Sequence, residues 1–291
     1  MRITGDDEYK KYDLDNANNF DSELIERKTR KRHEEGYQKR EEKRSDRHYK
    51  QHQRVLNKCN QCYFNETRFL QDYVIAESDT VYVAFPSSIS PLHPQDKEPL
   101  THLVISPKSH FGNFVEIDEQ IQTELRNFQK SIIAFYLECF GMQTVFLETS
   151  IQSDHFIPHA QMECVGFTND DTDMEVFFKK SLQDDDSEWG THKKIIDTKA
   201  RKGMIWRCMP STGQFNYVHI DFNGMGGFAH VIEDSKKFGK TKALEVLGGA
   251  MGHDFVNLSI PYRKEKAEKY VKDIRQRFKK YDWTRYGGSK K

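Results

Sequence analysis

The sequence predicts an α+β protein, in which an antiparallel sheet with one long helix is followed by a second, smaller α+β domain. Three observations lead to this prediction. Short runs of β-branched and aromatic residues flank one long amphipathic segment, charge gathers before residue 57, and the composition shifts again after residue 166. We therefore expect a charged, basic arm (1–56), a first folded domain (57–166) and a second domain ending in a basic helix (167–291).

The arm contains almost no residues that could form a core. In segment 27–50, lysine and arginine outnumber aspartate and glutamate. The plain interpretation is a solvated helix or a disordered arm, and the functional one is an arm that lies on RNA phosphates or on an acidic protein surface. The two are compatible, because a segment disordered alone can order on a partner. The RNA-contact candidates here are Arg30, Lys31, Arg32, Lys39, Arg40, Lys43 and Arg44.

Four short segments of the first domain predict strands. Residues 80–85, 102–106 and 144–148 are rich in β-branched and aromatic side chains. Residues 157–165 alternate apolar and polar side chains, which is typical of a half-buried strand. The order strand, strand, helix, strand, strand favours an antiparallel sheet.

Residues 118–141 predict a long helix. Asp118 suits its first turn and Gly141 its end. Apolar residues recur every three or four positions and form one face, which places Cys139 in the expected core. This face consists of Ile121, Leu125, Phe128, Ile132, Phe135 and Cys139.

The second domain is expected to mix helices and strands. An acidic stretch after residue 168 is expected to be helical, and residues 206–210 and 215–222 are strand candidates. A glycine-rich turn at 223–227 leads into an apolar strand. Residues 261–283 predict a basic amphipathic helix.

Charge and cysteine content narrow the class of protein. The formal net charge is zero, so bulk charge favours neither nucleic acid nor a membrane surface. No run approaches the roughly 18 apolar residues of a membrane span, so we expect no membrane partner. The polar start of the chain is not typical of a signal peptide. Five cysteines, an odd and sparse set, predict a reduced, intracellular protein.

The segment 157–165 carries an unusual polar row. Side chains two apart on a strand share a face, so His159, Gln161 and Glu163 are expected to stand together. Rows of this kind build active sites when all three positions are histidine.

Cys59 and Cys62 form a C-x-x-C pair at the start of the folded region. With His110 and His159, each at the end of a predicted strand, they form a candidate Cys2His2 zinc site. His102 and His155 are rival ligands. A redox function of the cysteine pair is the alternative, but it needs a βαβ setting that the neighbouring sequence does not predict.

These motifs resemble the histidine-triad superfamily of nucleotide hydrolases and nucleotidyl transferases. The resemblance lies in the C-x-x-C pair, the run H-L-V-I-x-P-K-x-H at 102–110, and the strand led by His159. It implies structural zinc bound by Cys59, Cys62, His110 and His159. It also implies that Gln161 stands where active members have a histidine nucleophile. An amide cannot act as that nucleophile, and Glu163 would repel a phosphate. We therefore expect no catalytic residues and no enzyme activity.

Three further motifs resemble the CwfJ-like, or complexed-with-Cdc-five, spliceosome-associated family over about residues 57–286. They are E-C-V at 163–165, E-W-G with K-K-I-I-D at 188–197, and G-G-F-A-H-V-I-E-D at 226–234. The resemblance implies a histidine-triad-like domain followed by a CwfJ C-terminal domain. It further implies a nuclear protein of late spliceosomes and the intron lariat complex, with spliceosome proteins, spliceosomal RNA, the intron lariat and the lariat debranching enzyme as partners.

Two features of the second domain invite functional interpretations. Backbone amides of the turn at 224–227 could cradle a phosphate, although a tight turn with glycines at positive φ is the plainer interpretation. The terminal helix adds three RNA-contact candidates, Lys272, Arg275 and Lys279, on its basic face.

The leading hypothesis is a non-catalytic, zinc-stabilised scaffold that contacts RNA and protein in pre-mRNA splicing and assists lariat debranching. The alternative is a nucleotide hydrolase or RNA-end processing enzyme with a relocated nucleophile, such as His155 or His102. A third hypothesis is an adaptor whose basic segments bind acidic protein partners only.

Overall fold

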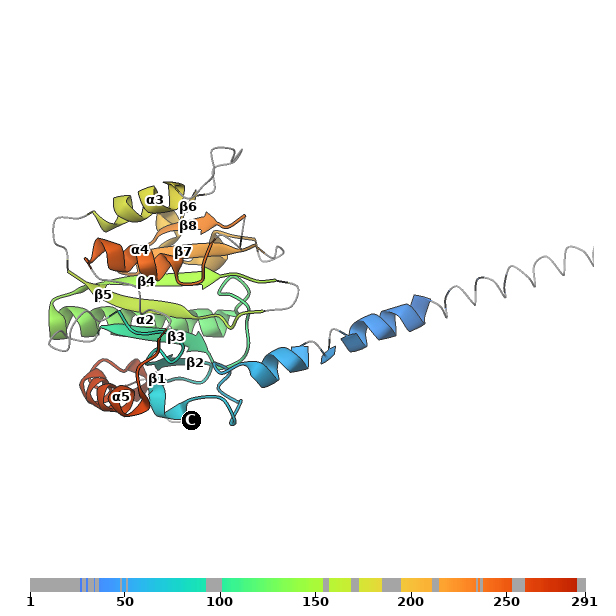
Figure 1. Cartoon of the computed structure of the whole chain (residues 1–291), viewed down its shortest axis with the longest axis horizontal. Helices are drawn as coiled ribbons and strands as arrows, with labels where there is room; N and C mark the ends of the chain where they lie inside the picture. The colour runs from blue at the N-terminus through green and yellow to red at the C-terminus, as the bar shows by residue number, and fades with distance from the viewer. Residues whose placement is uncertain are drawn as a thin grey trace, which may run out of the picture. The chain divides into compact units, whose positions relative to one another are not determined.

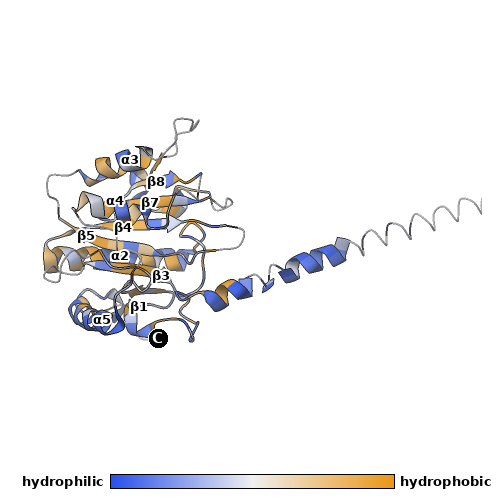
Figure 2. Ribbon diagram, in the orientation of Figure 1, coloured by the Kyte–Doolittle hydropathy of each residue, from blue (hydrophilic) through white to orange (hydrophobic). Residues whose placement is uncertain are grey.

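The computed structural model describes residues 27, 30, 34, 37–47, 49–50, 52–92, 101–153, 157–168, 173–184, 195–210, 215–233, 235, 238–252 and 260–286. The chain divides into two compact units, Met1–Val55 and Leu56–Lys291. In the first unit, residues 37–47 form an exposed helix that is mostly hydrophilic (Figure 2). Lys31 and Arg32 lie outside the described residues.

The second unit is built on one antiparallel sheet of eight strands, in the order β1-β2-β3-β5-β4-β7-β8-β6 (Figure 1). The predicted α+β fold with an antiparallel sheet is confirmed. The strands are β1 (Val74–Glu77), β2 (Val81–Ala84), β3 (His102–Pro107), β4 (Gln143–Ser150), β5 (Met162–Phe167), β6 (Ile195–Asp197), β7 (Tyr217–Phe222) and β8 (Gly227–Val231).

Strands from both halves of the sequence join in this sheet. β4 pairs with β7 over six residues, from Val145 opposite Phe222 to Ser150 opposite Tyr217. Residues 57–166 and 167–291 therefore share one continuous sheet. The boundary expected near residue 166 falls between β5 and α3 (Met174–Asp184) and stays a prediction.

The predicted long helix is confirmed as α2 (Glu119–Phe140). The Asp118 side chain accepts a hydrogen bond from the Ile121 amide, and Gly141 ends the helix at φ 67°. The expectation that Cys139 lies in the core is wrong, because its side chain is exposed. The buried face ends at Phe135 and Tyr136, and the last turn extends past the apolar contacts.

Helices cover both faces of the sheet. Along β4, Phe146 packs with α2 and with α5 (Lys264–Phe278), whereas Val145 and Leu147 pack with α3 and with α4 (Lys242–Ala250). Neighbouring residues of a strand point to opposite faces, so one apolar strand serves two cores. Among the described residues, no helix combines the length and apolar character needed to cross a bilayer.

The expected strand at 206–210 is wrong. Residues Ile205–Arg207 form a single 3-10 turn, with Ile205 buried in the core. Periodicity cannot separate such a short apolar run from a strand. The sequence also did not indicate β1, β6 or α4. The remaining short turns are η1 (Gln71–Tyr73), η2 (Lys199–Arg201) and η4 (Trp283–Arg285).

Candidate metal centre

Four predicted ligands converge in the structure. One ligand atom each from Cys59, Cys62, His110 and His159 lies within 4.8 Å of the other three. His110 Nδ1 lies 3.3 Å from Cys62 Sγ, and His159 Nδ1 lies 3.5 Å from both sulfur atoms. The two imidazole rings stand at 89° with their centres 5.0 Å apart.

These separations fit a tetrahedral zinc ion. Zinc binds thiolate sulfur at about 2.3 Å and imidazole nitrogen at about 2.0–2.1 Å, so sulfur and nitrogen ligands of one ion stand about 3.6 Å apart. The observed sulfur–nitrogen distances of 3.3–3.5 Å are close to this value. Two sulfurs and two nitrogens also form a typical donor set of closed structural zinc sites.

A hydrogen-bonded loop positions the two cysteines. The Asn65 side chain donates to the carbonyl oxygens of Leu56 and Cys59, at 3.0 and 2.8 Å. The Asn65 amide donates to the Cys62 carbonyl oxygen, and the Tyr82 hydroxyl donates to that of Gln61 at 2.7 Å. The loop is therefore closed on itself and tied to β2.

Backbone contacts place the two histidines beside this loop. The Tyr63 amide donates to the carbonyl oxygen of Lys108, just after β3. The Ala160 amide donates to the carbonyl oxygen of Phe111, which brings the segments after His110 and His159 together. The ring of His159 also binds the Pro107 carbonyl oxygen through Nε2, at 2.8 Å.

The protein surroundings favour a thiolate at Cys59. A hydrogen bond with Cys62 lowers the pKa of the Cys59 thiol far below its usual value, against the effect of burial, and the same contact raises the pKa of Cys62. Metal binding needs deprotonated sulfur, so this environment suits a cation.

The polar row is only partly a strand. The expectation that His159, Gln161 and Glu163 share one strand is wrong, because β5 begins at Met162. The neighbouring strand β3 ends at Pro107, and proline has no backbone N–H to donate to a sheet. The carbonyl oxygen of Pro107 is hydrogen-bonded to Nε2 of His159. Gln161 and Glu163 do meet, since Gln161 Nε2 donates to Glu163 Oε1 at 2.5 Å.

His102 completes this polar cluster from β3. Its Nε2 lies 2.8 Å from Glu163 Oε2, and its Nδ1 accepts a hydrogen bond from the Leu92 amide at 2.9 Å. An amide only donates, so Nδ1 carries no proton and Nε2 must donate to Glu163. Both ring nitrogens of His102 are thus engaged, and its ring is not part of the four-residue cluster, so His102 is not a rival metal ligand. His155 lies outside the described residues.

Three of the four amides in the turn at 224–227 already bond to the protein, including that of Met225, which donates to the Phe222 carbonyl oxygen at 3.0 Å. The Gly226 amide donates to Asp221 Oδ1 at 2.8 Å, and the Gly227 amide donates to Thr198 Oγ1 at 3.0 Å. Gly224 and Gly226 have φ of 68° and 96°. The plainer interpretation, a tight turn that needs positive φ, is thus the observed one.

The basic RNA-contact candidates differ in their surroundings. Lys272 is exposed on α5, and Lys279 is exposed directly after the last residue of this helix. Arg275 instead donates from Nε to the Val74 carbonyl oxygen at 3.0 Å and from its guanidinium to that of Asp72 at 3.1 Å. In the arm, Arg30, Lys39, Arg40, Lys43 and Arg44 are exposed.

Several supporting residues gave little sequence signal. Asn65 follows the cysteine pair, and asparagine often bonds to loop backbone, but its targets are set only by the folded loop. Arg126 of α2 pairs with the buried Asp221 at 3.6 Å and donates to the Gly224 carbonyl oxygen. These partners are almost 100 residues apart, so periodicity cannot indicate them.

Two family models match the chain in sequence order. Residues 46–179 match the model described as "Protein similar to CwfJ C-terminal". Residues 188–284 match "Protein similar to CwfJ C-terminus 2".

Similar curated proteins are longer than this chain. CWF19-like protein 2 of Danio rerio is 30% identical over 237 residues, covering 79% of this chain and 23% of that protein. The CWF19-like protein 2 homolog of Caenorhabditis elegans is 28% identical over 268 residues, covering 89% and 53%. Pre-mRNA-splicing factor cwf19 of Schizosaccharomyces pombe is 29% identical over 252 residues, covering 79% and 36%. The chain thus spans about a quarter to a half of these relatives.

A solved structure gives a weaker match. A hypothetical histidine triad nucleotide-binding protein from Sulfolobus tokodaii is 14% identical, with a TM-score of 0.38. The alignment covers 80% of this chain and 99% of that protein.

Proposed function

Because the chain belongs to the CwfJ-like family, we propose that it acts in pre-mRNA splicing as a nuclear, non-catalytic scaffold. The name of the fission yeast relative, a pre-mRNA-splicing factor, supports the process. The finer proposal is that the protein joins late spliceosomes and the intron lariat complex, where it contacts spliceosomal RNA, the lariat and other spliceosome proteins and assists the lariat debranching enzyme. The family resemblance supports this finer part.

One observation carries the non-catalytic proposal. Next to His159, which faces the cysteine pair, Gln161 occupies the nucleophile position of the row and donates to Glu163. A neutral amide cannot form a covalent bond to phosphorus or take up a proton near neutral pH. The row thus keeps its metal-facing histidine and lacks a group for phosphoryl chemistry.

His102 is a poor substitute nucleophile. Its Nδ1 lone pair accepts from Leu92, and its Nε2 carries the proton that Glu163 accepts. Neither ring nitrogen has a free lone pair for attack, and the ring is fully buried. These contacts weigh against the alternative of a nucleotide hydrolase or RNA-end processing enzyme that uses His102.

Zinc serves as a structural ion in this proposal. The four clustered side chains would fill all four positions of a tetrahedral ion, which would leave no open position for a substrate. The ion would link the cysteine loop to the ends of β3 and β5, and so contribute folding energy.

RNA contact is proposed for two basic surfaces. On the arm helix, Lys39 with Lys43 and Arg40 with Arg44 are four residues apart and exposed, so each pair shares one side. At the C-terminal end of α5, Lys272 and the capping residue Lys279 are seven residues apart and share another side. Such contacts bind phosphates with little sequence preference and weaken with salt.

Activity assays test the enzyme question. The wild-type protein is expected to leave an adenosine phosphoramidate and a capped dinucleotide intact. A Gln161→His variant reports whether a histidine restored at this position of the row gives turnover of these substrates. Wild-type turnover that is lost in His102→Gln or His155→Gln would refute the scaffold proposal.

Crosslinking to single-stranded RNA separates the scaffold from the pure protein adaptor. Lys272→Ala with Lys279→Ala is expected to weaken binding and lower the slope of log affinity against log salt by about 2. A double change to alanine at Lys130 of α2 and Lys202 after η2, exposed lysines outside α5 and the arm, serves as the control. Absence of RNA crosslinks at both surfaces would favour the adaptor.

A further inference from the structure

Two tyrosines stand side by side where α5 begins. Tyr262 lies just before the helix and Tyr270 in its second turn, with their ring centres 5.9 Å apart. Both rings also rest on the buried Phe85, which follows β2, at 6.2 and 6.5 Å between ring centres. The core therefore holds both rings in place, while both tyrosines stay partly exposed.

A flexible side chain covers these rings from the outside. Lys266 places its ammonium group 4.7 Å from the centre of the Tyr262 ring and 6.0 Å from that of the Tyr270 ring. Lys266 is itself exposed, so the ring surface beneath it is covered by a side chain that can move and not by the core. Base stacking on an aromatic ring is stronger than an exposed cation–π contact, so a nucleobase can replace the ammonium group.

The charges beside the tyrosines favour an occupant that carries phosphates. Lys264 pairs with Glu268 at 3.6 Å, so these two charges offset each other. The other charged residues of 263–270 are three cations and one carboxylate, namely Arg263, Lys266, Lys269 and Glu265. The segment that carries Phe85, residues 85–92, has no charged side chain. A net positive charge thus remains next to the two rings.

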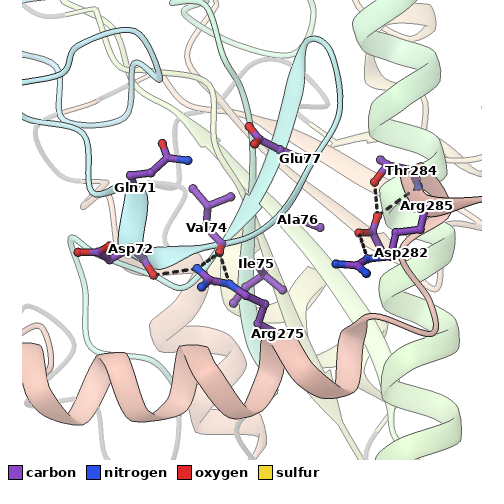
Figure 3. A pocket seen from close by; sticks show the side chains of 10 residues that line it. All are labelled: Gln71, Asp72, Val74, Ile75, Ala76, Glu77, Arg275, Asp282, Thr284 and Arg285. Carbon is purple, nitrogen blue, oxygen red and sulfur yellow. Dashed lines mark hydrogen bonds and ion pairs between the residues drawn. The ribbon is translucent and has the colours of Figure 1, made fainter. Parts of the chain in front are cut away.

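The opposite side of α5 is a different surface. Arg275 lies about 140° around the helix from Tyr270 and donates to backbone carbonyl oxygens of η1 and β1 (Figure 3). The carboxylate of Asp72 lines the groove beside Arg275, away from the tyrosines. Lys272 lies about 160° from Tyr270 and shares its side with Lys279. The tyrosine side is therefore separate from the lysine pair already proposed to contact RNA.

We propose that Tyr262 and Tyr270 form a stacking site for the bases of single-stranded RNA. A base stacks on the Tyr262 ring, Lys266 moves from the ring to a phosphate, and Arg263 and Lys269 bind neighbouring phosphates. Bases inside a duplex are not available for such stacking, so this site selects single strands. This inference rests on the proposed RNA contact and adds to it a site that binds bases.

The test compares two labelled RNAs of about 12 nucleotides, an oligoadenosine and an abasic analogue with the same number of phosphates. Fluorescence anisotropy with the full chain measures both affinities. Tyr262→Ala should bind the intact RNA about tenfold more weakly and the abasic RNA as wild type does. Tyr262→Phe keeps the ring and should bind both like wild type. Phe215→Ala, which removes an exposed ring before β7, should also match wild type.

A lysine variant separates the phosphate contacts from the stacking. Lys269→Ala should weaken binding of both RNAs equally and lower the slope of log affinity against log salt by about 1. Ultraviolet crosslinks from the intact RNA to the wild-type chain should map to Tyr262 or Tyr270. If Tyr262→Ala does not fold, as judged by urea unfolding, these crosslinks decide the question alone.

Three results would overturn the stacking site and leave the proposed RNA role standing or fallen in a distinguishable way. RNA binding that depends on Lys272 and Lys279 but not on Tyr262 would remove only the stacking site. Competition at the tyrosines by a proline-rich peptide, without RNA crosslinks there, would assign them to a protein partner, since such a peptide has no phosphates for the cations. Absence of any RNA binding by wild type at low salt would overturn both proposals.

Discussion

The ring of His159 is oriented by the carbonyl oxygen of Pro107. Nε2 lies 2.8 Å from that oxygen, which can only accept, so Nε2 carries the proton. Nδ1 is then left with its lone pair toward the cysteine pair, 3.5 Å from each sulfur. Such outer contacts commonly set the tautomer of a metal-binding histidine.

Removing one cysteine ligand should release zinc. We expect the purified wild type to contain one zinc ion per chain and Cys59→Ser to contain almost none. Losing the ion should lower the free energy of unfolding by about 4 kcal/mol or more, because metal binding is coupled to folding. Elemental analysis and urea unfolding measure the two effects.

Cys139→Ser is the matched control for that experiment. Its thiol is exposed and outside the ligand cluster, so zinc content and stability should be unchanged. A Cys59→Ser protein that keeps its metal and unfolds like wild type would show that the four-ligand assignment is wrong.

The Asn65 side chain should tune zinc affinity without binding the ion. Asn65→Ala removes the donors to the carbonyl oxygens of Leu56 and Cys59 and loosens the loop. We expect about tenfold weaker zinc binding in competition with a chromophoric chelator. Thr67→Ala, which removes only a donor to Asn65 Oδ1, should have a much smaller effect. Equal affinities for the two variants would contradict this role.

Glu148 should make stability depend on pH. Burial raises the pKa of this carboxyl from 4.5 to about 7, although hydrogen bonds from the Phe114 amide and the Tyr217 hydroxyl oppose the shift. A raised folded pKa adds stability that is fully present below the unfolded pKa and is lost as pH rises through the folded pKa. The unfolding free energy should therefore fall between about pH 4.5 and 7 on account of this group.

Glu148→Gln should remove this dependence, because the amide stays neutral while its oxygen can still accept both hydrogen bonds. The variant should equal wild type near pH 4 and exceed it by about 3 kcal/mol at pH 8. Urea unfolding of both proteins at several pH values in this range measures the difference between their unfolding free energies. The other titrating groups contribute equally to both proteins, so their contributions cancel in this difference. A difference that is constant with pH would refute the raised pKa.

Gly226 should tolerate substitution far less well than Gly141. Both have positive φ, at 96° and 67°. A Cβ at Gly226 would lie 2.7 Å from the Lys199 Cα, whereas at Gly141 nothing lies within 4 Å. We expect Gly141→Ala to cost about 1 kcal/mol for the left-handed backbone alone, and Gly226→Ala at least about 3 kcal/mol. Chemical unfolding measures both costs. If the two variants lose similar amounts of unfolding free energy, the backbone at η2 must move aside to make room for the added Cβ.

Local sequence patterns were enough for the main elements. The apolar period and the capping residues Asp118 and Gly141 predicted α2, and the runs at β2, β3 and β4 predicted strands. These signals are local, since helix and strand periods arise from neighbouring residues. They failed for 206–210, where the run is too short to distinguish a turn from a strand, and for β6, which has only three residues.

The sequence by itself determined the residue types of the candidate metal site, the glutamine at the nucleophile position and the α+β class. Only the tertiary structure decided that Cys59, Cys62, His110 and His159 meet, that His102 bonds to Glu163 instead, and that β4 and β7 join both halves in one sheet. It also decided that Arg275 caps β1, about 200 residues earlier in the chain. The reason is physical: such contacts depend on strand register and on backbone carbonyls that every residue carries, so no local pattern of side chains encodes them.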